Sequence, residues 1–256
     1  ASDVYKRQIA DVVVRDRRLR WPVARGIENR LRGQRIDSVG RRAKYLLINT
    51  ASGTALMHLG MTGSVFIVDS GTPAGVHDHI DLELDSGKAL RFRDPRRFGS
   101  FFFSERPAEH PLLAGLGPEP LGDAFDGEYL WTISRGRKVS VKQFIMNAHV
   151  VVGVGNIYAS ESLFRAGINP KRAAGRIARH RYDGLAASIK DVLARSIEAG
   201  GTTLRDFHGG DGKPGYFRQE LEVYDREDEH CRRCDTLITA IVQGQRRTYY
   251  CKTCQT

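Results

Sequence analysis

The chain carries all four of its cysteines in one stretch near its end, CRRCDTLITAIVQGQRRTYYCKTC, residues 231–254. Two CxxC pairs at this separation can offer four thiolates to one tetrahedral zinc ion, with a hairpin between the pairs. Two disulfides would be the alternative, but they need an oxidising compartment, and no leader that would send the chain there is evident. The stretch therefore predicts one structural Zn²⁺, with no open coordination position, on Cys231, Cys234, Cys251 and Cys254.

Upstream of this stretch, the first half of the chain has the alternation of apolar and polar residues that is typical of strands. Residues 79–85 alternate apolar and polar side chains, Ser86-Gly87 makes a turn, and residues 88–93 resume the alternation. This pattern predicts a hairpin with one solvent-exposed face. Similar runs predict a meandering antiparallel sandwich or barrel, with a helix only at its edge around Val23–Leu31, and they lie at residues 45–49, 56–59 and 64–68.

A Pro/Gly cluster at residues 116–122 marks the point where the pattern changes to a helical period. The apolar spacing predicts three helices: Val141–Ala148, Asn156–Gly167 with Asn156 as its cap, and a longer one along Leu185–Ile197 that ends at Gly200-Gly201. The segment Thr202–Tyr216 is rich in glycine, and we expect it to be a mobile loop or linker.

The chain of 256 residues is basic, with 40 Lys+Arg against 30 Asp+Glu and a formal charge of +10. Such an excess attracts polyanions, and nucleic acid is the first partner to consider, although solvated surface cations give a similar balance. The composition, 41% hydrophobic and 27% charged, excludes a disordered tail. No apolar run approaches the ~18 residues of a membrane span. With no secretory leader evident, we expect a cytoplasmic protein.

The turn Gly153-Val154-Gly155-Asn156 stands between two of the predicted helices. Its glycines would let backbone N–H groups approach a phosphate, and the N-terminus of the following helix favours an anion. A tight connection between two helices would use the same residues, so this turn alone is ambiguous.

Taken together, five sequence blocks resemble one family, the formamidopyrimidine-DNA glycosylases, which are bacterial repair enzymes for oxidised purines. The blocks occur in the family's order, and they are RRAKYLL (41–47), HLGMTG (58–63), DPRRFG (94–99), VGVGNIYASE (152–161) and the two cysteine pairs. An ordered set of this kind is highly specific. It covers the chain from about Ile9 to the C-terminus.

The resemblance implies an α+β fold: an N-terminal antiparallel β-sandwich, a helix-two-turns-helix module and a zinc-finger hairpin. With the composition breaks above, it predicts a sandwich over residues 1–116, a hinge over 117–135, the helical module with its lesion loop over 136–215 and the finger over 216–256. It also implies double-stranded DNA with oxidised or abasic sites as the partner, bound by a monomer between the two halves.

The family's chemistry begins at an N-terminal proline, whose amine attacks the sugar C1′, followed by a glutamate that handles protons. Residues 1–8 of this sequence match neither, and Ser2 follows Ala1. We therefore expect that the chain as written lacks the catalytic proline and glutamate and is catalytically impaired.

Two further catalytic positions follow from the resemblance. Lys44 matches the lysine credited with proton transfer during β-elimination and with a phosphate contact, although such a lysine is otherwise an ordinary solvated residue. Arg246 matches the finger arginine that inserts into DNA and assists δ-elimination, with Arg247 as the alternative if the register shifts by one. The five donors of an arginine suit adjacent phosphates.

Six more residues match DNA-binding positions of the family. Met61, Arg96 and Phe98 match the wedge that fills the space left when the damaged nucleotide is flipped out, a step that costs a few kcal/mol. Core packing is the alternative for Met61 and Phe98. The other three matches are DNA contacts, at His77, Arg137 and Asn156. A metal site at His77-Asp78-His79 lacks a third ligand and is disfavoured.

The sequence leaves three functions to compare. The leading one is a bifunctional glycosylase and abasic-site (β,δ) lyase acting on 8-oxoguanine and formamidopyrimidines. The related endonuclease VIII branch prefers oxidised pyrimidines, but the wedge residues and the block at 152–161 favour the purine branch. A DNA-binding protein without catalysis is the third, because residues 1–8 do not match the family's opening.

Overall fold

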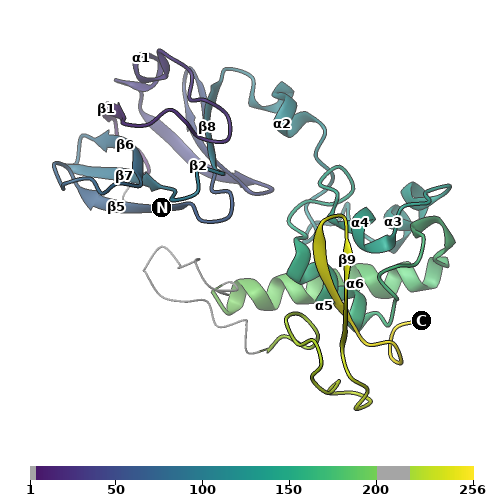
Figure 1. Ribbon diagram of the computed structural model, residues 1–256. Coiled ribbons are helices and arrows are strands. Elements are labelled where there is room, and N and C mark those ends of the chain that lie inside the picture. The colour runs from purple at the N-terminus through teal and green to yellow at the C-terminus, as the bar shows by residue number, and fades with distance from the viewer. Residues whose placement is uncertain (1–3, 201–219) are drawn as a thin grey trace. The chain divides into compact units, whose positions relative to one another are not determined.

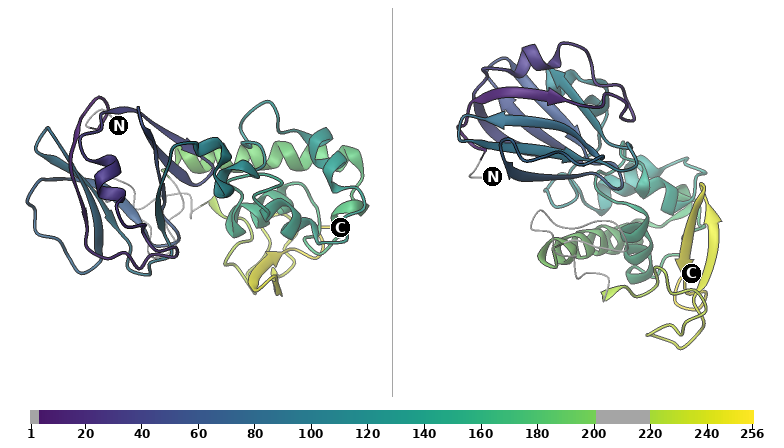
Figure 2. Two further views of the ribbon diagram at one scale, coloured as in Figure 1. Left: turned by 90° about the horizontal axis from the view of Figure 1, so that it is seen from above. Right: turned by 60° about the vertical axis from the view of Figure 1, so that its left-hand side comes forward.

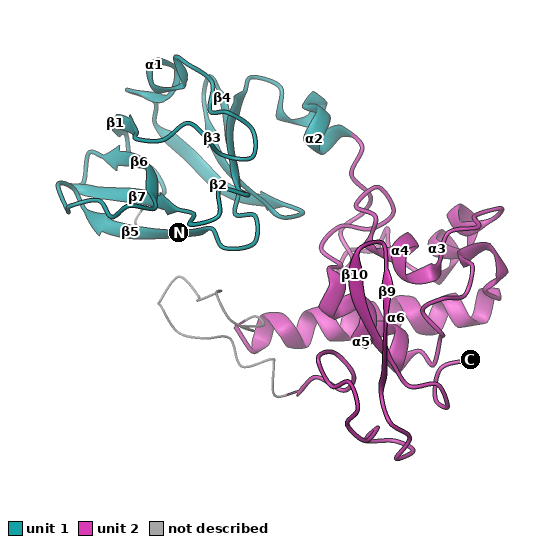
Figure 3. Cartoon of the chain, in the orientation of Figure 1, with its two compact units in different colours: residues 1–114, 203–215 teal, residues 115–202, 216–256 magenta. Residues whose placement is uncertain are grey.

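The computed structural model describes residues 4–200 and 220–256. The chain forms two compact units, residues 1–114 with 203–215 and residues 115–202 with 216–256 (Figure 3). Figure 1 labels their helices and strands. The segment Thr202–Tyr216, predicted to be a loop, and Ala1 and Ser2 lie outside the described residues.

Unit 1 is a sandwich of two four-stranded antiparallel sheets, with strand orders β1-β6-β7-β5 and β2-β3-β4-β8 (Figure 2). The strands are β1 (Ile9–Val14), β2 (Ile36–Arg42), β3 (Tyr45–Thr50), β4 (Gly53–His58), β5 (Ser64–Asp69), β6 (Asp78–Leu84), β7 (Lys88–Arg93) and β8 (Ser100–Ser104). Three short helices accompany them: α1 (Ile27–Leu31), η1 (Pro107–Glu109) and α2 (Pro111–Ala114). Side chains from both sheets, including Ile48, Met57, Phe92 and Phe101, form one buried core. The predicted sandwich is confirmed.

The face of the hairpin β6–β7 that its alternation predicted to be solvent-exposed is exposed only in part. Asp81 and Arg91 on that face are buried, at 2% and 3% exposure. Arg91 donates two hydrogen bonds to the Asp81 carboxylate, of 2.9 and 2.8 Å, and others to the carbonyls of Thr72 and Pro73 in the β5–β6 loop. That loop covers the face, and the charges are satisfied by pairing beneath it. An alternating pattern does not reveal whether its charged residues will be hydrated at the surface or paired with each other in the interior.

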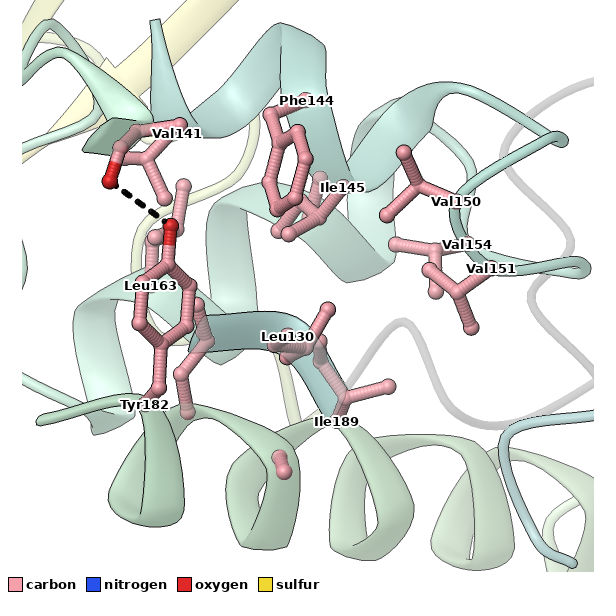
Figure 4. Packing of buried hydrophobic residues seen from close by; sticks show 14 of the residues in the cluster. Leu130, Val141, Phe144, Ile145, Val150, Val151, Val154, Leu163, Tyr182 and Ile189 are labelled. Atoms are coloured by element: carbon pink, nitrogen blue, oxygen red, sulfur yellow. Dashed lines mark hydrogen bonds between the residues drawn. The ribbon is translucent and has the colours of Figure 1, made fainter. Parts of the chain in front are cut away.

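Unit 2 is built around helices packed on α6. Its elements are α3 (Gly127–Ser134), α4 (Val141–Met146), α5 (Asn156–Arg165), η2 (Ala174–Arg176), α6 (Arg179–Glu198) and the finger strands β9 (Thr239–Gln243) and β10 (Arg246–Tyr250). Leu130, Phe144, Leu163 and Ile189 bring four of these helices into one core (Figure 4). The buried Tyr182 hydroxyl donates to the Ala174 carbonyl at 2.9 Å, so the core contains no unpaired polar group at this point.

Two details of unit 2 differ from expectation. Gly155 takes the N-cap position of α5 and Asn156 is the first helical residue, because the Asn156 side chain bonds to other groups and makes no cap hydrogen bond. The stretch 117–135, expected to be a hinge, contains α3, and its Leu130 belongs to the core of unit 2. None of the described helices is long and apolar enough to cross a membrane.

Candidate nucleic-acid interface

One end of the unit 1 sandwich brings together most of the residues that were predicted to bind DNA. In the sheet register Tyr45 pairs with His58 and His58 with Ser100, while in the other sheet Arg93 pairs with both Ser64 and Asp78. The turns and loops that leave these paired positions therefore lie at the same end. They carry Lys44, Met61, His77, Arg96 and Phe98.

The buried carboxylate of Asp94 joins the two loops that carry Met61 and Phe98. It accepts a hydrogen bond of 2.8 Å from the Thr62 hydroxyl and one of 2.7 Å from the Gly99 N–H. The Thr62 hydroxyl in turn accepts from the Arg96 N–H at 3.3 Å. Since Asp94 and Gly99 are both buried, the bond between them is protected from competition by water.

Met61 and Phe98 are exposed, at 63% and 43%, although both are large and apolar. Core packing, the alternative interpretation from sequence, is therefore excluded for both. The Arg96 guanidinium lies over the Phe98 ring, 4.6 Å from its centroid. Gly60 makes the tight approach of the two loops possible, because it has a φ of +67° and an added Cβ would lie 2.6 Å from the Phe98 carbonyl carbon.

His77 is attached at the same end of the sandwich by hydrogen bonds of its own backbone and of the two residues that follow it. Its carbonyl accepts from the Asp94 N–H at 3.0 Å. Asp78 binds Arg93 and accepts from the Gly75 N–H, and His79 bonds through Nε2 to the Asp94 carbonyl at 2.8 Å. These bonds occupy Asp78 and His79, in keeping with the sequence argument against a metal site at residues 77–79.

Lys44 lies at the tip of the β2–β3 hairpin, after Ala43, whose φ is +53°. Its neighbour His58 accepts the Gly60 N–H at Nδ1, 2.9 Å away, and packs on the Tyr45 ring. Burial, together with the positive charge of Lys44, lowers the pKa of His58 below its ordinary value. His58 is thus neutral at physiological pH, with Nδ1 available as the acceptor that fixes the start of the Met61 loop.

In unit 2, Lys142 is the centre of a buried network. It is 1% exposed, and its ammonium donates to Asn156 Oδ1 at 2.6 Å, Thr248 Oγ1 at 2.6 Å and the Arg247 carbonyl at 3.2 Å. Burial and the nearby Arg246 charge lower the pKa of Lys142 to about 8. It therefore remains mostly protonated at pH 7, and its three N–H donors meet three acceptors.

This network fixes Asn156 against the finger. The Asn156 amide nitrogen donates to the Arg247 carbonyl at 3.0 Å and to the Tyr224 hydroxyl at 3.3 Å. Glu161, five residues along α5, accepts the backbone N–H groups of residues 222, 223 and 224. Asn156 and Glu161 belong to the block at residues 152–161, whose glycine turn could bind a phosphate. The same block thus also attaches the finger to α5.

The two candidate arginines of the finger differ in their surroundings. Arg247 pairs with Glu227 and its guanidinium lies by the Tyr249 ring, 5.6 Å from the centroid. Arg246 is exposed at the start of β10, and among residues 4–200 and 220–256 it has no ion-pair partner. Arg246 is therefore the one of the two that is available to an external anion.

Arg137 is exposed in the turn after α3. It borders a hollow of about 260 Å³ whose wall also includes Tyr129, Gln143, Asn147 and His149. The backbone at this position is fixed, because the Arg137 N–H donates to the Ser134 carbonyl at 3.0 Å and its own carbonyl accepts from Gly175 at 2.9 Å.

The four cysteines of the finger have the arrangement of a metal centre. Their Sγ atoms all lie within 4.8 Å of one another, with Cys231 3.9 Å from Cys254 and Cys234 3.4 Å from Cys251. A tetrahedron with Zn–S bonds of about 2.3 Å has S–S edges of roughly 3.8 Å, so the residues fit one zinc ion. Four thiolates leave no position for water, and the site is structural.

We expect the purified protein to contain about one zinc per chain, measured by elemental analysis. Chelation, or Cys251→Ser, should unfold the β9–β10 hairpin and weaken DNA binding about tenfold or more, since Arg246 loses its support. The unit 1 sandwich should keep its strand signal in circular dichroism. Disulfides in non-reducing mass spectrometry would contradict the zinc assignment.

Sequence reasoning missed Asp94, His58 and Lys142 as residues that organise this interface. Asp94 and His58 belong to blocks that were singled out, but nothing in a pattern tells a buried carboxylate from an exposed one. Lys142 lies in a predicted helix, where a lysine is normally solvent-exposed. Only the packing of the finger on α5 shows its partners.

The two units define a protein of the helix-two-turns-helix class with a four-cysteine finger, and comparison with known families agrees. The matches are the formamidopyrimidine-DNA glycosylase N-terminal domain over residues 1–101, the formamidopyrimidine-DNA glycosylase H2TH domain over 116–208, and the zinc finger found in FPG and IleRS over 228–256. The chain belongs to the formamidopyrimidine-DNA glycosylase family.

Individual relatives are similar along nearly the whole chain. The formamidopyrimidine-DNA glycosylase of Stutzerimonas stutzeri is 58% identical over 248 residues, which are 97% of this chain and 92% of the relative. The crystal structure of the MutM (Fpg) protein from Thermus thermophilus has a TM-score of 0.88 at 35% identity, covering 99% of this chain and 93% of that one. The Lactococcus lactis Fpg in complex with Fapy-dG-containing DNA has a TM-score of 0.89 at 26% identity, covering 100% and 95%.

Proposed function

We propose that this protein repairs oxidised DNA as a glycosylase and abasic-site lyase that acts on 8-oxoguanine and formamidopyrimidines. The observation that carries the proposal is the exposed pair Met61 and Phe98, fixed by Asp94 at the same end of the sandwich as Lys44. Exposed large apolar groups held rigidly among cations suit insertion into a base stack beside a phosphate backbone. The relatives named formamidopyrimidine-DNA glycosylases support the choice of purine lesions.

In this proposal the damaged nucleotide leaves the helix, and Met61, Arg96 and Phe98 fill the space that it vacates. The inserted side chains offset part of the few kcal/mol lost in unstacking and unpairing. His77 and Arg137 bind the DNA backbone, and Asn156, whose amide already bonds to Lys142, Tyr224 and Arg247, would do so through the backbone N–H groups at the start of α5. Phosphate contacts of this kind position the duplex without reading its sequence.

Lys44 and Arg246 have the catalytic roles in this scheme. Lys44 contacts a phosphate and transfers a proton during β-elimination. Arg246, which has no ion-pair partner among the described residues, binds the phosphates next to the abasic site and assists δ-elimination. The Lactococcus lactis Fpg has been solved in complex with Fapy-dG-containing DNA and with abasic-site-containing DNA, which supports both kinds of DNA as ligands. Action as a monomer in the bacterial cytoplasm, at the nucleoid, stays a prediction.

The attacking amine is a separate proposal. We infer that residues 1–8 do not reproduce the family's proline and glutamate, because Ser2 follows Ala1 and neither residue type occurs among them. A polypeptide of these 256 residues is therefore expected to bind damaged duplex and to excise the base slowly.

The wedge assignment is tested by comparing three alanine variants on lesion-containing and undamaged duplex. Met61→Ala and Phe98→Ala should weaken binding of an 8-oxoguanine or abasic-analogue duplex about tenfold and leave the undamaged duplex nearly unaffected. Arg137→Ala should weaken both duplexes alike and lower the salt slope by about one phosphate contact. Fluorescence anisotropy over a range of salt concentrations measures all three. Equal losses on both duplexes for every variant would exclude the wedge.

A further inference from the structure

The segment between β1 and α1 reaches the end of the sandwich that carries Lys44. The Arg20 N–H donates to the Gly99 carbonyl at 3.1 Å. Gly99 precedes Ser100, which pairs with His58, and His58 pairs with Tyr45. Arg20 thus lies next to the row of paired residues that runs from Ser100 in β8 through His58 in β4 to Tyr45 in β3, and Tyr45 follows Lys44 in the chain.

Three of the other arginines of this segment are neutralised by carboxylates, whereas Arg25, next to α1, is exposed and has no ion pair among residues 4–200 and 220–256. Arg15 pairs with Asp81 at 2.6 Å and Arg18 with Asp16 at 2.9 Å. Arg17 pairs with Glu28. These ion pairs fix the segment and cancel three of its positive charges, so it is not a uniformly basic surface.

Arg20 differs from these three paired arginines. It is exposed, and within the described part of the chain its guanidinium has neither an ion pair nor a hydrogen bond. The preceding Leu19 is buried in the sandwich core, which anchors the backbone at this point. The Arg20 side chain is therefore a cation on an anchored stretch of backbone, and it has no partner among residues 4–200 and 220–256.

The charge of Arg20 acts on the same groups as that of Lys44. Burial raises the pKa of Tyr45, and the Arg20 charge opposes that rise. Burial, then Lys44, then Arg20 lower the pKa of His58. The buried carboxylate of Asp94 opposes this effect on His58 only in part, since the net direction of the His58 pKa is still downward. The end of the sandwich that carries Lys44 thus holds two cations, Lys44 and Arg20, near the neutral imidazole of His58. This combination favours the binding of a phosphate group.

We propose that Arg20 binds a DNA backbone phosphate adjacent to the one at Lys44. Arg20 lies outside the five sequence blocks that resemble the family, so this contact does not follow from them. The proposal rests on the proposed function, because the ligand is taken to be the same duplex. It assigns the segment between β1 and α1 a role in holding the DNA where the wedge inserts.

The test compares Arg20→Ala, Arg20→Lys and Arg18→Ala in the full chain, with Arg137→Ala as a reference for a phosphate contact. The probe is a fluorescent duplex with an abasic analogue, titrated between low and moderate salt. Arg20→Ala should raise Kd about tenfold near 0.1 M salt and reduce the slope of log Kd against log salt by about 0.9. Arg20→Lys should keep the slope, and Arg18→Ala, which loses only an exposed pair with Asp16, should match the unchanged protein.

Thermal melting by circular dichroism shows whether Arg20→Ala is folded, and we expect no change because the side chain is exposed. A salt slope equal to that of the unchanged protein, with Arg137→Ala still reduced, would overturn the inference and leave the proposed function intact. If the unchanged protein itself fails to bind the duplex, the proposed function and this inference fail together. A loss in Arg18→Ala as large as in Arg20→Ala would also overturn it, because the effect would then be that of any cation in the segment.

Discussion

Asp94→Ala is expected to destabilise unit 1 by about 2–4 kcal/mol and to abolish the preference for damaged duplex. The substitution leaves the buried Gly99 N–H and the half-buried Thr62 hydroxyl without their acceptor, and a buried group left unsatisfied costs about 1–3 kcal/mol. The loops that carry Met61 and Phe98 then lose their common attachment. Chemical denaturation measures the first effect, and anisotropy with lesion and undamaged duplexes measures the second.

Asp94→Asn is the matched control for this prediction. Its amide oxygen can still accept from Gly99, and its NH₂ group can donate to the Thr62 hydroxyl, which is able to rotate. We expect it to keep most of the stability and most of the discrimination. If Asp94→Ala binds damaged duplex as selectively as the unchanged protein, the loops are fixed by other contacts and Asp94 is not their link.

The largest effect is expected from supplying the family's opening. A polypeptide in which residues 1–8 are replaced by the Pro-Glu-Leu-Pro-Glu-Val opening and its helix should excise 8-oxoguanine several powers of ten faster than the 256-residue polypeptide. An amine must be unprotonated and positioned at C1′ to form a Schiff base. An ordinary lysine has a pKa of about 10.4, so few lysine amines could substitute at neutral pH.

Borohydride trapping measures the Schiff base directly, and single-turnover nicking measures the rate. The polypeptide with the added opening should be trapped through its proline, and a Pro→Gly change at that position should reduce the trapping. Lys44→Ala in the same background should slow β-elimination more than base release. If the 256-residue polypeptide is trapped and cuts at the rate of the extended one, the nucleophile lies elsewhere, at Ala1 or Lys44.

Sequence patterns predicted the elements whose signals are local. The two CxxC pairs predict a metal site almost by themselves, because their spacing suits four thiolates around one tetrahedral ion. The antiparallel strands followed from alternation, and the helices of unit 2 from apolar spacing, although element ends differed by several residues: α1 begins at Ile27 rather than Val23, and α4 ends at Met146 rather than Ala148. Such ends depend on capping and tertiary contacts that spacing alone does not encode.

The features that the patterns did not predict depend on contacts between distant segments. Burial of Arg91 and Asp81 requires the β5–β6 loop to fold over the hairpin, and the Lys142 network requires the finger to return to α4 and α5. Asn156 was expected to cap its own helix, but its side chain bonds Lys142 across 14 residues instead. Long-range polar partners of this kind leave no periodic signal in a sequence.

We infer that this chain recognises damaged DNA through the wedge of unit 1 that Asp94 supports, and a competition between damaged and undamaged duplex tests this claim. The 256-residue polypeptide is titrated into a labelled abasic-analogue duplex, in competition with the unlabelled duplex of the same sequence without damage. We predict that the damaged duplex binds at least about tenfold more tightly, and that Met61→Ala removes most of this difference. Equal affinity for the two duplexes at every salt concentration would contradict the claim.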